Sequence, residues 1–186
     1  MSSCFNYRGA IKISLNSLGA FTVLCLFQLQ TNAQVNIKQI NSPSQVTPVE
    51  QAPQVSQPEI RLVLRLTKRR VYVYKGEKVL ASYPVAIGKP GWETPLGNFK
   101  VIEMLENPGW TNFKTGEVIA PGKNSPLGER WIAFWTDGRD YIGFHGTPNR
   151  ASVGKAVSHG CVRMYNEDVR KLYNFVKFGT SVTVSI

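Results

Sequence analysis

A cysteine and two histidines stand close together in one glycine-containing stretch, and these are the residue types that carry out covalent catalysis. Both histidines of the 186-residue chain, His145 and His159, lie shortly before Cys161. A thiolate is a far better nucleophile than a thiol, so a cysteine that reacts at neutral pH needs a base nearby. His145 can fold back onto the thiol as that base, because Gly146 and Gly160 let the backbone approach closely. The stretch predicts Cys161 as nucleophile and His145 as proton acceptor.

Two further side chains lie two positions on either side of the predicted nucleophile. In an extended segment, His159 and Arg163 would point to the same face as Cys161. His159 either supports catalysis or only shapes the turn. Arg163 either grips a substrate carboxylate with its fork of donors or forms an ion pair with Glu167 or Asp168.

Two other interpretations of the cluster have to be weighed. A lone cysteine is often a small buried hydrophobe, but one within a turn rich in histidine, glycine and arginine is poorly placed for the core. A zinc site formed by His145, His159 and Cys161 is chemically sound. The paired-ligand spacings of structural zinc modules are absent, however, so we predict no metal.

The same residues resemble a known family. Residues 158–163 read Ser-His-Gly-Cys-Val-Arg and follow the His-Gly-Thr of residues 145–147 at the spacing found in L,D-transpeptidase catalytic domains of the YkuD type. The resemblance covers about residues 62–186 and includes residues 85–99 and 124–132. Some family members carry Asn where this chain has Arg163, and a subgroup carries Arg.

This resemblance implies a β-sandwich-like fold and a cofactor-free enzyme that cross-links peptidoglycan stem peptides, and so contributes to cell wall organisation and cell shape. Cys161 would form a thioester with the donor stem, and His145 would donate and accept the proton. A backbone carbonyl at Gly146 would orient the imidazole. From the residues alone, N–H groups of the Gly160–Cys161 turn would hold the oxyanion. We expect Ser158, Arg163 and Trp92 to contact the substrate, with packing of Trp92 under its own loop as the alternative.

Two alternative functions remain open from the sequence. Water in place of an amine as acyl acceptor would make the protein an L,D-carboxypeptidase or an amide hydrolase acting on stem peptides. A non-catalytic wall-binding module is the other alternative, although such a module would have no need for the pair of His145 and Cys161.

The charge of the chain bears on its partners. The formal net charge is +10, but the basic residues are scattered and no nucleic-acid-binding signature accompanies them, so we predict no nucleic-acid partner. A polyanionic cell-wall polymer or membrane surface suits this charge equally well.

The first part of the chain has the composition of a targeting segment. Arg8 and Lys12 precede an apolar run over residues 18–29, and Ala33 offers a small residue for cleavage. We expect residues 1–33 to be an export signal, with retention as an uncleaved membrane tether as the alternative, and a location in the periplasm or cell wall. Removal of this signal would take Cys4 and Cys25 away and leave Cys161 as the one cysteine of the mature chain.

Residues 34–59 are rich in Gln, Pro, Ser, Val and Asn, with few charges and no aromatic residue. Such a composition predicts a flexible linker. It would precede a single catalytic domain over residues 60–186.

The elements that must position the cluster are mostly strands. Alternation or β-branched residues predict strands over residues 60–66, 71–74, 79–87, 99–105, 131–135, 141–144 and 182–184. The first three form a meander, Asp137-Gly138 makes a hairpin turn, and residues 106–128 are expected to be an irregular functional loop. Asn166 is the predicted N-cap of one helix with Val169, Leu172, Tyr173 and Val176 on its apolar side. We therefore predict a mostly-β domain with one helix after the cysteine.

Overall fold

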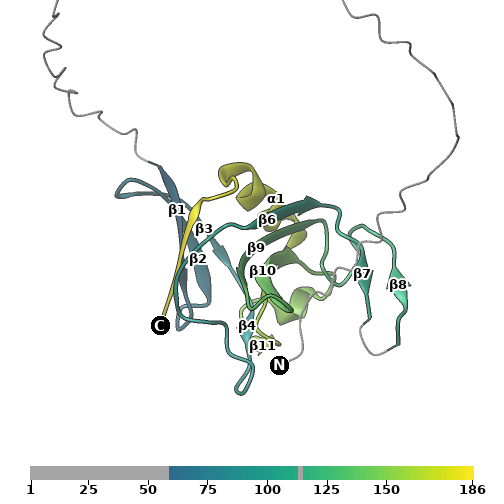
Figure 1. Ribbon diagram of the computed structural model, residues 1–186. Coiled ribbons are helices and arrows are strands. Elements are labelled where there is room, and N and C mark those ends of the chain that lie inside the picture. Colours follow the sequence, from purple (N-terminus) through teal and green to yellow (C-terminus); the bar gives the residue numbers. More distant parts are fainter. Residues whose placement is uncertain (1–58, 113–114) are drawn as a thin grey trace, which may run out of the picture. The chain divides into compact units, whose positions relative to one another are not determined.

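The computed structural model describes residues 59–112 and 115–186 (Figure 1). The predicted export signal lies outside these residues, as does all of the predicted linker except its last position. In the part of the chain that is described, the fold consists of two main sheets, one α-helix and several short elements. The prediction of a mostly-β domain with one α-helix is confirmed.

The larger sheet has five strands in the order β3-β2-β1-β13-β5. Their bounds are β1 (Ile60–Arg65), β2 (Arg70–Lys75), β3 (Lys78–Pro84), β5 (Gly97–Lys100) and β13 (Ser181–Ser185). The first three strands pair antiparallel, which confirms the predicted meander, whereas β13 pairs parallel with β1. Leu62 and Leu64 are fully buried, as their alternation predicts.

The second sheet has four strands in the order β12-β10-β9-β6. These are β6 (Glu103–Glu106), β9 (Arg130–Thr136), β10 (Tyr141–Gly146) and β12 (Val162–Met164). The turn predicted at Asp137-Gly138 does join β9 to β10. Its geometry comes from the Asp137 carboxylate, which accepts the N–H groups of Arg139 and Asp140 at 2.9 and 2.7 Å.

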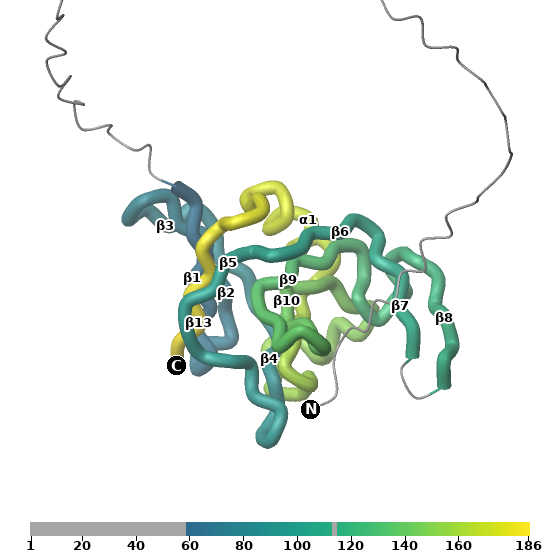
Figure 2. Tube along the Cα trace, in the orientation of Figure 1, coloured from purple at the N-terminus to yellow at the C-terminus, as the bar shows by residue number. Residues whose placement is uncertain are grey.

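Two predicted strands are each divided in the structure. The strand expected over residues 99–105 becomes β5 and β6 in different sheets, because the Val101 N–H bonds to Thr180 O and the Ile102 N–H bonds to Ala133 O. The tube in Figure 2 follows the chain across from β5 to β6. The strand expected over residues 79–87 ends at Pro84, and β4 (Ile87–Gly88) pairs instead with β11 (Ala156–Ser158).

The segment predicted to be irregular contains a small hairpin. Strands β7 (Trp110–Thr111) and β8 (Val118–Ile119) pair antiparallel within it. A short 3-10 helix, η1 (Arg150–Ser152), follows β10 in the chain.

Helix α1 (Asn166–Phe175) buries Val169 and Leu172 in the core, as their spacing predicts. Its N-cap is Tyr165 rather than the predicted Asn166, and the side chain of Asn166 bonds to another segment. Glu167 and Asp168 do lie in the first turn, where acidic groups favour the helix dipole.

The main core joins both sheets and the helix. It contains Leu62, Val71 and Val182 from the larger sheet, Ile132, Phe134 and Phe144 from the smaller one, and Val169 and Leu172 from α1. No helix among the described residues is both long and apolar enough to pass through a membrane. The opposite face of the four-stranded sheet carries the candidate site.

Candidate active site

The register of the four-stranded sheet places the predicted catalytic residues on one face. Phe144 stands opposite Val162 and Ile132, and all three point into the main core. The next residue along β10, His145, stands opposite Arg163 and Trp131. Because side chains alternate along a strand, this second row faces away from the main core.

Cys161 belongs to the same face. It directly precedes β12 and packs with Leu127, Trp131 and Ala133 in a separate small cluster. Cys161 is buried in this cluster, although the glycine-rich turn had predicted a residue outside any core. The sheet therefore brings Cys161 and His145 to neighbouring strands on a common face, sixteen positions apart in the sequence.

The His145 ring is buried and anchored by its own neighbour. Its Nδ1 lies 2.6 Å from the Gly146 carbonyl oxygen. A carbonyl can only accept, so Nδ1 carries the proton and Nε2 keeps its lone pair in the neutral ring. Burial lowers the pKa of His145 from 6.5 to about 4; the hydrogen bond to Gly146 acts against this shift, and the charge of Arg163 adds to it. At neutral pH the imidazole is thus uncharged and able to accept a proton.

The turn before Cys161 is held by a serine hydroxyl. Ser158 Oγ donates to the Cys161 carbonyl at 2.6 Å and accepts the Gly160 N–H at 3.2 Å. Ser158 is buried, so its hydroxyl shapes the turn rather than contacting substrate as predicted. The Gly160 N–H is likewise occupied inside the turn, which argues against its predicted role as an oxyanion donor.

Gly160 also separates His159 from Cys161. Its φ of +111° is a backbone conformation that breaks the extended alternation. The predicted common face of His159 and Cys161 is therefore wrong, and His159 is exposed where Cys161 is buried. The His159 ring packs edge-on against Trp92, with centroids 4.7 Å apart. This contact joins the loop of Trp92 to the turn before Cys161.

The segment that carries Trp92 runs along the other side of the turn. The Lys89 N–H bonds to Ser158 O, and Ala86 exchanges two backbone hydrogen bonds with Arg163. Thr94, which is 2 % exposed, donates its hydroxyl to the Gly160 carbonyl at 2.8 Å. The Cys161 turn is therefore held between β10 and the segment around β4.

Arg163 is half-buried beside His145. Burial lowers the pKa of its guanidinium, and none of the ion pairs found among the described residues includes it. The predicted alternatives, Glu167 and Asp168, instead face Arg150 and Lys171. Arg163 thus places a positive charge on the face that carries His145.

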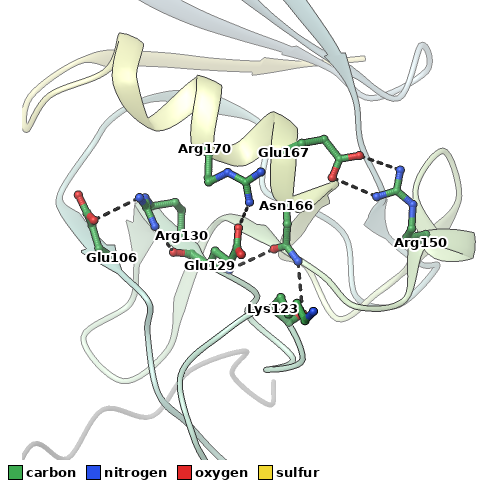
Figure 3. Close-up of polar contacts among 8 residues, drawn as sticks. All are labelled: Glu106, Lys123, Glu129, Arg130, Arg150, Asn166, Glu167 and Arg170. Atoms are coloured by element: carbon green, nitrogen blue, oxygen red, sulfur yellow. Dashed lines mark hydrogen bonds and ion pairs between the residues drawn. The ribbon is translucent and has the colours of Figure 1, made fainter.

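A polar network fixes the segment that follows the β7–β8 hairpin (Figure 3). Asn166 Oδ1 accepts the Glu129 N–H at 3.1 Å, and its Nδ2 donates to Lys123 O at 3.3 Å. Glu129 also pairs with Arg170, and Arg130 pairs with Glu106 at 3.2 Å. These contacts join α1 to the residues leading into β9.

Asn166 also lies directly against Gly146, whose carbonyl holds the His145 ring. A Cβ atom at Gly146 would come within 2.0 Å of Asn166 Oδ1, and one at Gly128 within 2.2 Å. A side chain at Gly146 would therefore displace that of Asn166, and one at Gly128, where φ is +63°, would also meet the backbone of Gly146 at 2.6 Å. Gly146, whose carbonyl holds His145, is consequently packed against Asn166 of this network.

The zinc alternative involves His145, His159 and Cys161. Among residues 59–112 and 115–186, no three His, Cys, Asp or Glu side chains are grouped so that they could hold a metal ion. The arrangement suits proton transfer and nucleophilic attack by the chain's own side chains.

The sequence did not indicate the contact of Thr94 with the Cys161 turn, and the prediction of Asn166 as a helix N-cap was wrong. Thr94 stands in a glycine- and proline-rich loop, and only the fold brings its hydroxyl to Gly160, 66 positions away. Asn166 has the sequence context of an N-cap, and nothing local indicates its contacts with Lys123 and Glu129. The one available signal for Thr94 was its place inside a stretch that resembles the family.

Comparison with known proteins identifies a family model over nearly the whole described region. The model YkuD, L,D-transpeptidase catalytic domain, matches residues 59–184. The protein YkuD of Bacillus licheniformis is 31% identical over 160 residues, covering 84% of this chain and 84% of the relative. YkuD of Bacillus subtilis is 39% identical over 108 residues, covering 58% of this chain and 55% of the relative.

A solved structure has the same fold. The chain superposes on L,D-transpeptidase 3 from Mycobacterium tuberculosis, in complex with a faropenem-derived adduct, with a TM-score of 0.55 and 20% identity. The match covers 69% of this chain and 61% of that one. The chain therefore spans well under two thirds of the length of several proteins that it resembles, and this likeness concerns the fold.

Proposed function

Since the chain belongs to the YkuD family of L,D-transpeptidase catalytic domains, we propose that it is an exported peptidoglycan L,D-transpeptidase that works through a thioester on Cys161. The observation that supports this proposal most directly is the state of His145. Its Nδ1 is engaged by the Gly146 carbonyl at 2.6 Å, and its pKa is lowered to about 4. A neutral imidazole on the face that carries Cys161 suits a general base.

Acylation begins with transfer of the Cys161 thiol proton to His145 Nε2. The sulfur attacks the carbonyl that follows the L-centre of diaminopimelate in a donor tetrapeptide stem. The bond to the terminal D-Ala breaks, and the D-Ala nitrogen leaves as an amine with the proton held by His145. The donor stem remains as a thioester on Cys161.

Deacylation reverses these roles. A side-chain amine of a second stem loses a proton to His145 and attacks the thioester carbonyl. The carbon–sulfur bond breaks, the new amide cross-links the two stems, and Cys161 recovers its proton. No carboxylate is required as a third member, since the Gly146 carbonyl orients the imidazole and stabilises its protonated form.

Substrate recognition is assigned to two side chains at the edges of the site. Arg163 offers a fork of N–H donors to a carboxylate of the stem peptide. Trp92, held by His159, offers an apolar surface beside the turn.

The composition of residues 1–33 supports the export part of this proposal, and with it a location in the periplasm or at the cell wall. Fractionation of the producing cells and determination of the N-terminal residue of the recovered protein test this part. Recovery in the cytosol with residue 1 intact would overturn it.

The reaction is tested with purified tetrapeptide muropeptides and mass spectrometry of the products. Cross-linked dimers formed with loss of D-Ala are the expected result. Tripeptide without dimers would show that water is the acceptor and the protein a carboxypeptidase. Binding without any product would leave only a recognition module. The negative control is Cys161→Ala, which should give no product.

A carbapenem serves as a second acylating reagent. The mycobacterial protein was crystallised with a faropenem-derived adduct; faropenem is a penem, a class of β-lactam related to the carbapenems, and we propose that a carbapenem acylates Cys161 here. Intact-protein mass spectrometry of the reduced protein should show one added drug mass, absent in Cys161→Ala.

A further inference from the structure

We propose that Thr94 is a positioning residue that fixes the peptide plane between Gly160 and Cys161, so that the Cys161 N–H is aimed at the developing oxyanion. This inference rests on the proposed acyl transfer. It begins from a buried hydroxyl whose two hydrogen bonds join segments far apart in the chain.

Thr94 Oγ1 has a donor on one side and an acceptor on the other. It accepts the Gly88 N–H at 3.1 Å and donates to the Gly160 carbonyl at 2.8 Å. The direction of the second bond is settled because a carbonyl only accepts. Since Thr94 is 2 % exposed, water has little access to replace either bond.

The orientation of this carbonyl determines that of the next N–H. No cis peptide bond occurs among the described residues. In a planar trans peptide the C=O and the N–H point in opposite directions. A hydroxyl that holds the Gly160 oxygen on one side therefore directs the Cys161 N–H to the other side.

An external clamp is needed because the residue before the nucleophile is glycine. Gly160 has φ +111°, and glycine offers little resistance to rotation of the peptide that follows it. A side chain there would be restrictive but does not fit freely, since a Cβ atom would lie 3.1 Å from Ile142 Cδ1. The hydrogen bond from Thr94 therefore restricts the rotation of the Gly160–Cys161 peptide, as a side chain at residue 160 would otherwise do.

A second hydroxyl holds the neighbouring polar groups of the turn. Ser158 Oγ accepts the Gly160 N–H and donates to the Cys161 carbonyl. The two hydroxyls bind different groups of the turn. Ser158 binds the Gly160 N–H and the Cys161 carbonyl, and Thr94 binds the Gly160 carbonyl and so orients the peptide before the nucleophile. A pre-oriented N–H at this position stabilises the negative charge of a tetrahedral intermediate.

The loop that carries Thr94 is itself tightly folded. A Cβ atom at Gly88 would lie 2.0 Å from Trp92 O and 2.7 Å from Thr94 N. Gly88 therefore lets the chain turn back close enough for its N–H to reach the Thr94 hydroxyl. The hydroxyl is thus anchored at a defined place before it reaches Gly160.

Two reactions of the same sulfur separate this role from a general effect on folding. Acylation by a carbapenem passes through an oxyanion, whereas alkylation by iodoacetamide displaces iodide without one. Both rates are measured by mass spectrometry on full-length protein that has been reduced and desalted, with the modified cysteine identified by peptide mapping. Thr94→Val, which keeps the shape but loses the hydroxyl, should slow acylation of Cys161 on the order of 10- to 100-fold and leave its alkylation within about twofold.

The control variants make the result specific. Thr94→Ser keeps the hydroxyl and should recover the acylation rate. Thr180→Val removes another buried threonine hydroxyl, which accepts the Lys177 N–H at 2.9 Å, and should leave both rates unchanged. If Thr94→Val does not fold, Thr94→Ala is compared with Thr94→Ser under the same two reagents.

Results that contradict the role of Thr94 differ from results that contradict the thioester mechanism. Equal acylation rates in wild type and Thr94→Val, or equal slowing of acylation and alkylation, would overturn the role of Thr94. Absence of Cys161 acylation in the wild-type protein, by carbapenem and by tetrapeptide alike, would overturn the thioester mechanism itself.

Discussion

Arg150 and Glu167 form a double ion pair, with Nη2–Oε1 and Nη1–Oε2 distances of 2.7 and 3.0 Å. Glu167 is thereby engaged away from Arg163, the other arginine that the sequence offered as its partner. Arg163 stands opposite His145 in the register of β10 and β12, and its charge adds to the lowering of the pKa of that ring. Because Glu167 pairs with Arg150, it does not neutralise the charge of Arg163 beside His145.

Arg163→Met should raise the KM for tetrapeptide stems about tenfold or more, because a charge-assisted hydrogen bond to a carboxylate is worth roughly 1.5–3 kcal/mol. Steady-state kinetics on stems measure the change. Arg150→Met is the matched control and should alter KM little, since its ion pair is exposed. An unchanged KM in Arg163→Met would show that this arginine does not contact the substrate.

Cys161→Ala and Cys161→Ser should both abolish turnover, since a hydroxyl is much harder to deprotonate than a thiol. Loss of one buried sulfur should cost about 1 kcal/mol of unfolding free energy, so both variants should fold. Product formation by mass spectrometry and urea unfolding measure the two effects.

Wild-type activity should survive EDTA, because the proposed acyl transfer uses no metal. Loss of activity with EDTA and recovery with zinc would instead support a metal site formed by His145, His159 and Cys161.

His145→Ala should reduce kcat/KM by ~10²–10⁴-fold, the usual effect of removing a general base. His159→Ala should cost much less, because His159 is exposed and contacts Trp92. The two variants are compared on the same tetrapeptide substrate. A larger loss at His159 would reverse the assignment of the base.

The buried imidazole should make the folded protein sensitive to acid. Its pKa is about 4 when folded and about 6.5 in an unfolded chain, so the unfolded state binds more protons between these values. The contribution of His145 to stability is complete above pH 6.5 and is lost as the pH falls toward 4, by on the order of 3 kcal/mol. Urea unfolding at a series of pH values measures this.

The matching variants identify the group responsible. His145→Gln should flatten the fall in stability between pH 6.5 and 4, whereas His159→Gln should leave it in place. The same dependence in wild type and His145→Gln would mean that another group titrates.

Asn166→Leu should lower the unfolding free energy by about 1–3 kcal/mol, because it leaves the Glu129 N–H and the Lys123 carbonyl without their partner. Activity should fall as well, since the same side chain packs against Gly146. Asn98→Ala is the control; Asn98 is exposed and accepts one hydrogen bond, from Thr183 Oγ1. Equal stability of the two variants would show that the network of Figure 3 contributes little.

The sequence by itself determined what depends on local pattern. Alternation at Leu62 and Leu64 defined a strand and its buried face, and the spacing of Val169 and Leu172 defined the helix. The pairing of Cys161 with His145 was predicted from the sequence, because a thiol needs a base and few residues could supply it; the structure places the two residues on one face of the sheet. Even the Gly146 carbonyl as orienting group was expected, from the family resemblance.

The tertiary structure decided what depends on distant segments. It divided the strand predicted over residues 99–105 between two sheets, because Val101 bonds to Thr180, directly before β13 of one sheet, and Ile102 bonds to Ala133 in β9 of the other. It turned Asn166 from a helix cap into a link to Lys123 and Glu129. It also brought Thr94 to Gly160 across 66 positions, since a hydroxyl in a loop carries no local mark of the carbonyl that the fold will place beside it.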